Sequence, residues 1–489
     1  MSQLDHDSMM DRLSGAPLGG SGQTQSEKEL EKWQNEKQQL MIKQNREYLE
    51  SLLKENASTP VKVGQVQVNN GHVFRESFLQ AQLKPLLKSD LITLGKLCEG
   101  IDEVANNLRS LGVVDNMFVS LPDTPTRSMG GWGMTRNKTL QLTPVFNIAP
   151  VKRFYAKTGT NVGNGEGDGY IQFQLKNLFG GGENLVFDAI TGTKTQSSYL
   201  LNYTMPLMNS AKDVFEQSFY MNTKQLDWLK CDSKVKGATT RVSMQRGKVS
   251  HDISWENCWR VLSNTSSRAM DVLNQSGNDF KSALLYNVKY DTRDNAHLPT
   301  RGQYFRVGLE YSGILEACSQ RYIKQVVESQ RCLKLSDSHS LILTNKAGVL
   351  WSMNRAGSHV LDRFFIGGPN DVRSFLLNGL GPKSFNASVG GDLFINGGIS
   401  LVSRLPKVSP DSNFKLHNFI NFGSAVPMDR HNMEKTMASL RQISVGCGVG
   451  VLYNHPMARF ELNFVLPLVV HERDYVRKGI QYGIGISFL

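Results

Sequence analysis

Apolar and polar residues alternate with a period of two from about residue 150 to residue 489, and this pattern limits the folds open to the chain. Near the end, Ile480, Tyr482 and Ile484 occupy one phase, and Gln481 and Gly483 occupy the other. Such alternation places successive side chains on opposite faces of a β-strand. About sixteen runs of this kind are present, and many approach the roughly ten residues of a strand that crosses a bilayer.

Three features favour a membrane β-barrel of about sixteen antiparallel strands over soluble β-sandwiches, although composition alone leaves both open. The runs are longer than is usual for soluble strands. Their polar phase is rich in Gly, Asn, Gln and Ser, as a water-filled lumen permits. The last run has a strongly apolar phase, which lipid would cover. No apolar run reaches the roughly 18 residues that a transmembrane helix needs, so a helical membrane protein is excluded.

The N-terminal 25 residues predict a disordered tail. They are rich in Ser, Gly, Gln and Asp, and their one basic residue is Arg12. A secretory signal needs a basic start and an apolar core, and a mitochondrial presequence is Arg-rich and poor in acids. We therefore expect no cleaved targeting segment.

Residues 26–57 predict one amphipathic helix. Ser26 and Glu29 have the spacing of a capping box, and apolar residues recur at helical spacing from Leu30 to Leu52. The opposite face mixes charges of both signs. We therefore expect this helix to dock on protein rather than on a membrane surface.

Residues 59–149 predict a small α/β domain with the order strand, helix, helix, strand, strand. The expected elements span residues 61–68, 74–87, 94–111, 113–121 and 139–148. No catalytic pattern falls on them. We expect the domain to present a strand edge to an incoming peptide.

The sequence gives little support to an enzyme, a metal site or a cofactor site. The six cysteines are dispersed without a CxxC pair, which favours free thiols. GxSxG, HExxH and P-loop motifs are missing. Asp291 and Asp294 could suggest a metal site, but beside Arg293 and Arg301 they better fit a charge cluster that stabilises a turn. The net charge of +11 is spread along the chain, so we expect no nucleic-acid partner.

Two motifs resemble those of the BamA-like superfamily of outer-membrane assembly barrels. One runs from Tyr290 to Asn295 and continues from Leu298 to Gly302. The other is Ile366-Gly367-Gly368 followed by Val372, Arg373, Ser374 and Phe375, similar to the superfamily's Val-Arg-Gly-Phe loop motif. The resemblance implies one POTRA-like domain before a sixteen-stranded barrel, and it is strongest to the mitochondrial sorting and assembly branch. Ser374 departs from the usual Gly.

The resemblance also implies that a loop at about 356–388 folds into the barrel lumen. A desolvated Arg373 would need a carboxylate on the inner wall, and Phe375 would pack beside it. Without the motif, a solvated arginine on a surface loop would be the better interpretation.

The C-terminal strand matches the polar-x-Gly-x-x-hydrophobic-x-hydrophobic signal of mitochondrial barrels. The matching residues are Gln481, Gly483, Ile486 and Phe488. The glycine permits close approach of another backbone.

These features predict an insertase in the mitochondrial outer membrane, with its POTRA-like domain in the intermembrane space. A weak seam between the first strand (about 151–161) and the last (about 478–488) would open as a lateral gate, where a precursor strand could pair. The expected partners are β-barrel precursors, accessory subunits of a sorting and assembly complex, and membrane lipid. The alternatives are a passive pore of the same superfamily and a soluble β-rich interaction protein.

Overall fold

The computed structural model describes residues 25–87, 92–122, 140–163, 166–193, 195–354, 357–385, 387–408, 412–455 and 458–485. The predicted tail, apart from residue 25, lies outside these ranges, as do Ile486 and Phe488. Within them, no helix combines the length and apolar character needed to cross a bilayer. The chain divides into two compact units, one of residues 1–67, 85–103 and 120–145, the other of residues 68–84, 104–119 and 146–489.

The first unit contains helix α2 (Gln25–Glu55) and a three-stranded sheet. In this sheet β1 (Pro60–Val63) lies between β3 (Ile92–Thr93) and β5 (Leu140–Leu142). Val61 and Leu142 are buried, as the predicted β-branched strand requires. On α2, Trp33 and Tyr48 of the predicted apolar stripe are more than half exposed. These two side chains of the stripe are therefore not buried against the described residues of this chain.

A second three-stranded sheet has the order β2 (Gln67–Asn69), β6 (Val145–Pro150), β4 (Val114–Ser120), and most of its residues belong to the second unit. The remaining elements of this region are the 3-10 helix η1 (Gly71–Val73) and helices α3 (Glu76–Leu87) and α4 (Leu94–Ser110). Phe78, Leu108 and Phe146 are almost fully buried. The predicted strand 139–148 is divided into β5 and β6 at Pro144, which has no N–H to donate to a ladder.

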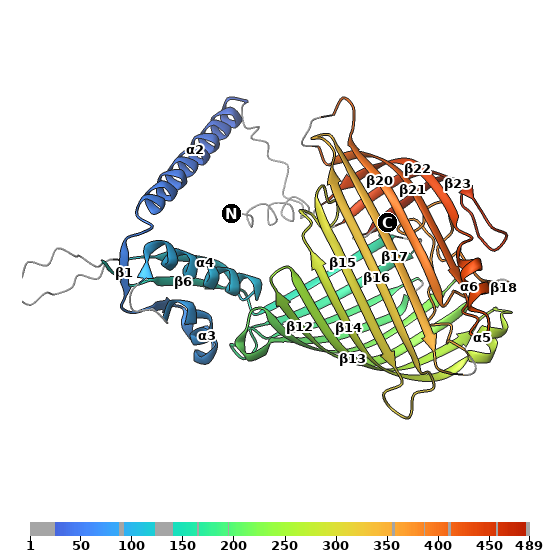
Figure 1. The fold of residues 1–489 in the computed structure, drawn as a ribbon. Coiled ribbons are helices and arrows are strands. Elements are labelled where there is room, and N and C mark those ends of the chain that lie inside the picture. Colours follow the sequence, from blue (N-terminus) through green and yellow to red (C-terminus); the bar gives the residue numbers. More distant parts are fainter. Residues whose placement is uncertain are drawn as a thin grey trace, which may run out of the picture. The chain divides into compact units, whose positions relative to one another are not determined.

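Sixteen antiparallel strands form the large sheet of the second unit, which confirms the predicted barrel class (Figure 1). They are β7 (Phe154–Gly163), β8 (Glu166–Lys176), β9 (Asn184–Gly192), β10 (Thr195–Pro206), β11 (Asp213–Leu226), β12 (Cys231–Arg246), β13 (Val249–Asn264), β14 (Gly277–Asp291), β15 (Gly302–Ser312), β16 (Tyr322–Lys334), β17 (His339–Ser352), β20 (Leu393–Arg404), β21 (Phe414–Val426), β22 (Ser444–Asn454), β23 (Arg459–Val469) and β24 (Gly479–Gly485). Connections carry η2 (Leu207–Asn209), α5 (Met270–Gln275) and α6 (Met433–Leu440).

The alternation in sequence becomes an inner and an outer face of this sheet. On β23, Arg459, Glu461 and Asn463 are buried, whereas Phe460 and Leu462 are exposed. Exposed apolar side chains on a curled sheet suit contact with lipid, and the buried polar side chains face the lumen.

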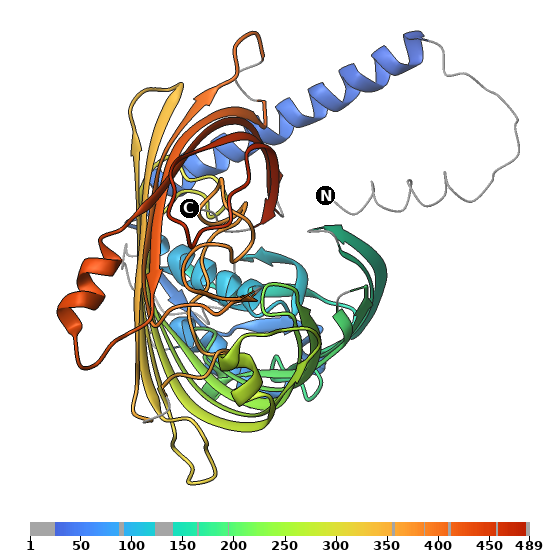
Figure 2. The same ribbon diagram turned by 90° about the vertical axis from the view of Figure 1, so that its right-hand side faces the viewer.

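β7 and β24 occupy the two ends of the strand order. Among the described residues, β7 pairs with β8 and β24 pairs with β23, and no ladder joins β7 to β24. Figure 2 shows the curled sheet nearly end-on, with these strands at its edges. The first strand of the sheet, β7, spans residues 154–163, whereas the sequence predicted about 151–161.

The segment between β17 and β20 lies inside the curled sheet (Figure 2). It contains the short hairpin of β18 (Lys383–Ser384) and β19 (Ala387–Ser388). Its Phe364, Val372 and Phe375 join a buried cluster with Phe394 and Ala425 of the wall. We call this segment the inward loop.

Candidate functional site

Arg373 lies at the tip of the inward loop and forms an ion pair with Glu461 on β23. Its Nη2 lies 2.9 Å from Glu461 Oε2, and neither side chain has exposed surface. Its Nε donates to Oε2 at 3.0 Å, and its Nη1 donates to Asn421 Oδ1 on β21 at 3.0 Å. An unpaired guanidinium would be costly at this depth, so the pairing fixes the loop tip on the wall.

Glu461 also contacts a second arginine and a histidine. Arg459 on the same strand contacts its carboxylate, and His417 Nδ1 lies 4.0 Å away. The guanidinium carbon of Arg373 lies 4.7 Å from the centroid of the Phe419 ring, a cation–π distance. Glu461 alone among these five residues is acidic, so the cluster depends on its charge.

Two glycines of the wall allow the loop tip to approach closely. A Cβ at Gly423 would lie 2.8 Å from Val372 Cγ2, and a Cβ at Gly446 would lie 2.7 Å from the carbonyl oxygen of Arg373. Close-packed interiors do not accommodate such contacts, so larger residues here would displace the tip.

Ser374 has the left-handed conformation that favours glycine. Its φ is 77°, which costs a residue with a Cβ about 1–2 kcal/mol. The residue is fully buried, and its hydroxyl has no hydrogen-bond partner among the described residues. The Gly expected from the resemblance would avoid both costs.

The loop tip also holds β24. The main-chain N–H of Ser374 donates to Gln481 Oε1 at 3.2 Å, and Gln481 Nε2 donates to the carbonyl oxygen of Phe375 at 3.4 Å. The side chain of Asn370 donates to the carbonyl oxygen of Ile484 at 2.9 Å. The loop therefore contacts the main chain of β24 directly.

The structure thus brings together part of the predicted strand signal and the predicted loop motif. Gln481 and Gly483 are buried on the inner face of β24, and Gly483 is the ladder partner of Glu461. Ile486 and Phe488 lie outside the described residues.

The segment from Tyr290 to Gly302 includes the end of β14, the connecting loop 292–301 and the first residue of β15. Asp291 and Arg293 form an ion pair at 2.9 Å, and Asp294 accepts a hydrogen bond from the hydroxyl of Thr300 at 2.5 Å. Gly302 has a φ of 109°. These contacts fit a turn-stabilising charge cluster, and the described residues contain no group of three or more acidic, His or Cys side chains suited to a metal.

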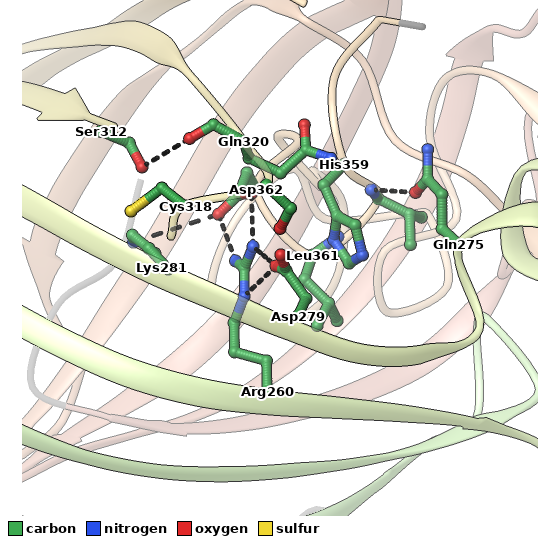
Figure 3. A network of polar contacts seen from close by, with 12 residues as sticks. Arg260, Gln275, Asp279, Lys281, Ser312, Cys318, Gln320, His359, Leu361 and Asp362 are labelled. Atoms are coloured by element: carbon green, nitrogen blue, oxygen red, sulfur yellow. Dashed lines mark hydrogen bonds and ion pairs between the residues drawn. The ribbon is translucent and has the colours of Figure 1, made fainter. Parts of the chain in front are cut away.

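A buried ionic network at the root of the inward loop was missed by the sequence analysis (Figure 3). Asp362 of the loop accepts from Arg260 Nη1 on β13 at 2.6 Å and from the Tyr322 hydroxyl on β16 at 3.0 Å. Arg260 Nε also donates to Asp279 Oδ2 on β14 at 2.9 Å. Lys324 Nζ donates to the main-chain oxygen of Asp362 at 2.8 Å. The loop is therefore anchored at its root and at its tip on different strands.

The sequence did contain one indication of this network: charged residues occur in the phase of the strand alternation that faces the lumen. Arg260 and Asp279 lie on neighbouring strands, where unpaired charges facing the interior are rare. Nothing local in the sequence identifies Asp362 as their partner, because it lies 102 positions after Arg260.

Curated relatives match most of the chain. Residues 177–488 match the family model of the Omp85 superfamily domain. The chain is 30% identical over 466 residues to the Sorting assembly machinery 50 kDa subunit of Saccharomyces cerevisiae, with 88% of this chain and 94% of that protein covered. It is 31% identical over 355 residues to the Sorting and assembly machinery component 50 homolog of Mus musculus, with 70% and 75% covered.

A solved structure shares the fold. BamA from Haemophilus ducreyi lacking POTRA domains 1-3 aligns with a TM-score of 0.70 at 13% identity, covering 87% of this chain and 84% of that chain. At this identity the likeness concerns the fold alone.

Proposed function

This chain belongs to the Omp85 superfamily and, within it, to the family of the 50 kDa subunit of the sorting and assembly machinery, and from this membership we propose that it works through a lateral gate between β7 and β24. Members of this family are insertases. The protein inserts β-barrel precursors into the mitochondrial outer membrane.

The single observation that carries the gate is the state of the two edge strands. Within the described residues no ladder joins β7 to β24, although each is fully paired on its other side. In lipid every backbone N–H and C=O needs a partner. When the seam opens, a precursor strand supplies the partners that the two edges then lack.

The inward loop keeps β24 in register while the seam is open. The tip motif of Val372, Arg373, Ser374 and Phe375 is anchored on β23 through Glu461 and contacts β24 through Gln481. β24 therefore stays in place when its outer edge is free, and its free main-chain groups template the incoming strand.

The N-terminal region receives precursors before they reach the gate. Residues 59–149 form the POTRA-like domain on the intermembrane-space side, and its short sheets offer edges for an extended peptide. Helix α2 (Gln25–Glu55) has the exposed Trp33 and Tyr48, which suit contact with an accessory subunit of the complex.

Cross-linking across the seam tests the gate. Cysteines at Ala156, Thr158 or Thr160 of β7 are combined with cysteines at Tyr482 or Ile484 of β24, and the pairs that form a disulfide define the register. The matched control for each pair is the variant that carries only one of the two introduced cysteines. Locked protein should remain folded but should not assemble newly imported porin, and reduction should restore assembly.

Normal porin assembly with the seam fully locked would overturn the lateral gate. It would leave the family membership untouched, because that rests on sequence relationship and not on the seam.

A further inference from the structure

A groove of about 560 Å³ opens over β9 to β13, away from the gate and the inward loop. Its walls include Phe187, Tyr199, Phe219 and Trp259, which are 37–63% exposed. Trp259 alternates along β13 with the lumen-facing Arg260 of the ionic network. The groove therefore lies on the outer face of the barrel, where lipid is the solvent.

Strand register explains why this part of the outer face is hollow. One row of cross-strand neighbours is Tyr199, Met221, Lys236 and Trp259, and the next row is Leu201, Phe219, Ala238 and Asn257. Ala238 has a single methyl group beside the tall ring of Phe219. The small Ala238 side chain therefore forms the bottom of the groove, and the larger aromatic side chains form its sides.

Lys236 places a positive charge at one end of the groove. Its ladder neighbour Trp259 packs against Phe280 on β14, with ring centroids 4.9 Å apart. Aromatic rings beside a lysine on the outer face are typical of the membrane interface, where the ammonium reaches the headgroups. The groove then runs from headgroup level at Lys236 toward the hydrocarbon at Ala238.

We propose that this groove binds one phospholipid whose headgroup carries a net negative charge. The phosphate pairs with Lys236, and one acyl chain lies over Ala238 between Phe219 and Trp259. Charge complementarity at Lys236 favours this occupant over a neutral lipid or an apolar protein segment.

Native mass spectrometry of the full-length protein tests the site. The detergent-solubilised protein is mixed with micelles containing equal amounts of phosphatidylglycerol and phosphatidylcholine. Wild-type protein should retain one phosphatidylglycerol in preference to phosphatidylcholine. Lys236→Gln should reduce that retention about fivefold, as expected for one lysine near a charged headgroup. Ala238→Leu fills the floor and should reduce retention of phosphatidylglycerol as well.

Lys234→Gln is the matched control, because Lys234 is exposed on the same strand and face but does not line the groove. The amount of phosphatidylglycerol that this variant retains should stay within twofold of the wild-type amount. Heat-dependent mobility on gels establishes that each barrel is folded, and Lys236→Gln carries the test if Ala238→Leu does not fold.

Three results would overturn the proposal. Equal retention of the two lipids by wild type indicates an unspecific lipid coat, and equal losses in both lysine variants indicate a general surface charge. A protein subunit that copurifies, blocks phosphatidylglycerol and is lost in Ala238→Leu indicates that the groove binds protein.

Discussion

The main-chain N–H of Ser374 donates to Oε1 of Gln481 at 3.2 Å, so one side-chain amide joins the loop tip to β24. At this contact Ser374 has a φ of 77°, which is unfavourable for a residue with a Cβ. The protein therefore carries strain at the point where the inward loop meets the proposed gate.

Replacement of Ser374 by glycine should relieve this strain. Ser374→Gly removes the unfavourable φ, worth about 1–2 kcal/mol, and an unpartnered buried hydroxyl, while the added freedom of glycine in the unfolded chain costs about 0.5–1 kcal/mol. We expect a gain of about 1 kcal/mol in the free energy of unfolding, measured by urea denaturation in detergent.

Ser374→Ala separates the two contributions, because it removes the hydroxyl and keeps the Cβ. It should gain less stability than Ser374→Gly. A loss of stability in the glycine variant would show that the left-handed conformation is not strained here.

Glu461 should matter more for stability than Arg373. Glu461→Gln leaves the buried guanidinium groups of Arg373 and Arg459 facing a neutral amide, and breaking a buried pair typically costs about 3–5 kcal/mol. Arg373→Met leaves Glu461 paired with Arg459 and should cost less. Urea denaturation of both variants gives the order, and the reverse order would contradict the assignment of Glu461 as the shared counter-ion.

Strand number and the inner and outer faces could be predicted because they depend on local alternation. Ile480 and Gln481 fall in opposite phases of the sequence alternation, and in the sheet Ile480 is exposed whereas Gln481 is buried on the inner face. Once the resemblance placed Arg373 inside the barrel, the cost of an unpaired buried charge predicted a carboxylate partner. The sequence did not identify Glu461 as that carboxylate, because the pairing depends on which part of β23 the loop tip contacts, and no local pattern encodes this.

The ionic network at the root of the inward loop was harder still to predict from the sequence. Arg260 and Asp279 are cross-strand neighbours whose pairing follows from register, but Asp362 joins them only after the loop has folded inward. Contacts of this kind are set by the packing of Phe364 and Phe394, and not by a sequence motif.

Asp362 should couple the root of the inward loop to the wall. Asp362→Asn weakens the contacts with Arg260 and Tyr322 but keeps the side-chain shape, so we expect the loop to become accessible to protease while the barrel stays folded. Asp279→Asn is the control, because it removes an acceptor of Arg260 that belongs to the wall. Equal protease sensitivity in both variants would mean that Asp362 has no special role in holding the loop.

Asp294 should make the turn between β14 and β15 sensitive to acid. Burial raises the pKa of its carboxyl, but hydrogen bonds from the hydroxyl and N–H of Thr300 and from the N–H groups of Arg301 and Asn295 lower it further, so the folded pKa lies below the ordinary value. A lowered folded pKa stabilises the protein above the unfolded pKa of about 4, and this contribution is lost as the pH falls through the folded pKa. The unfolding temperature of wild type should therefore drop more than that of Asp294→Asn between about pH 6 and pH 3. Fluorescence melting in detergent measures both proteins, and parallel curves would show that the Asp294 carboxylate does not stabilise the turn.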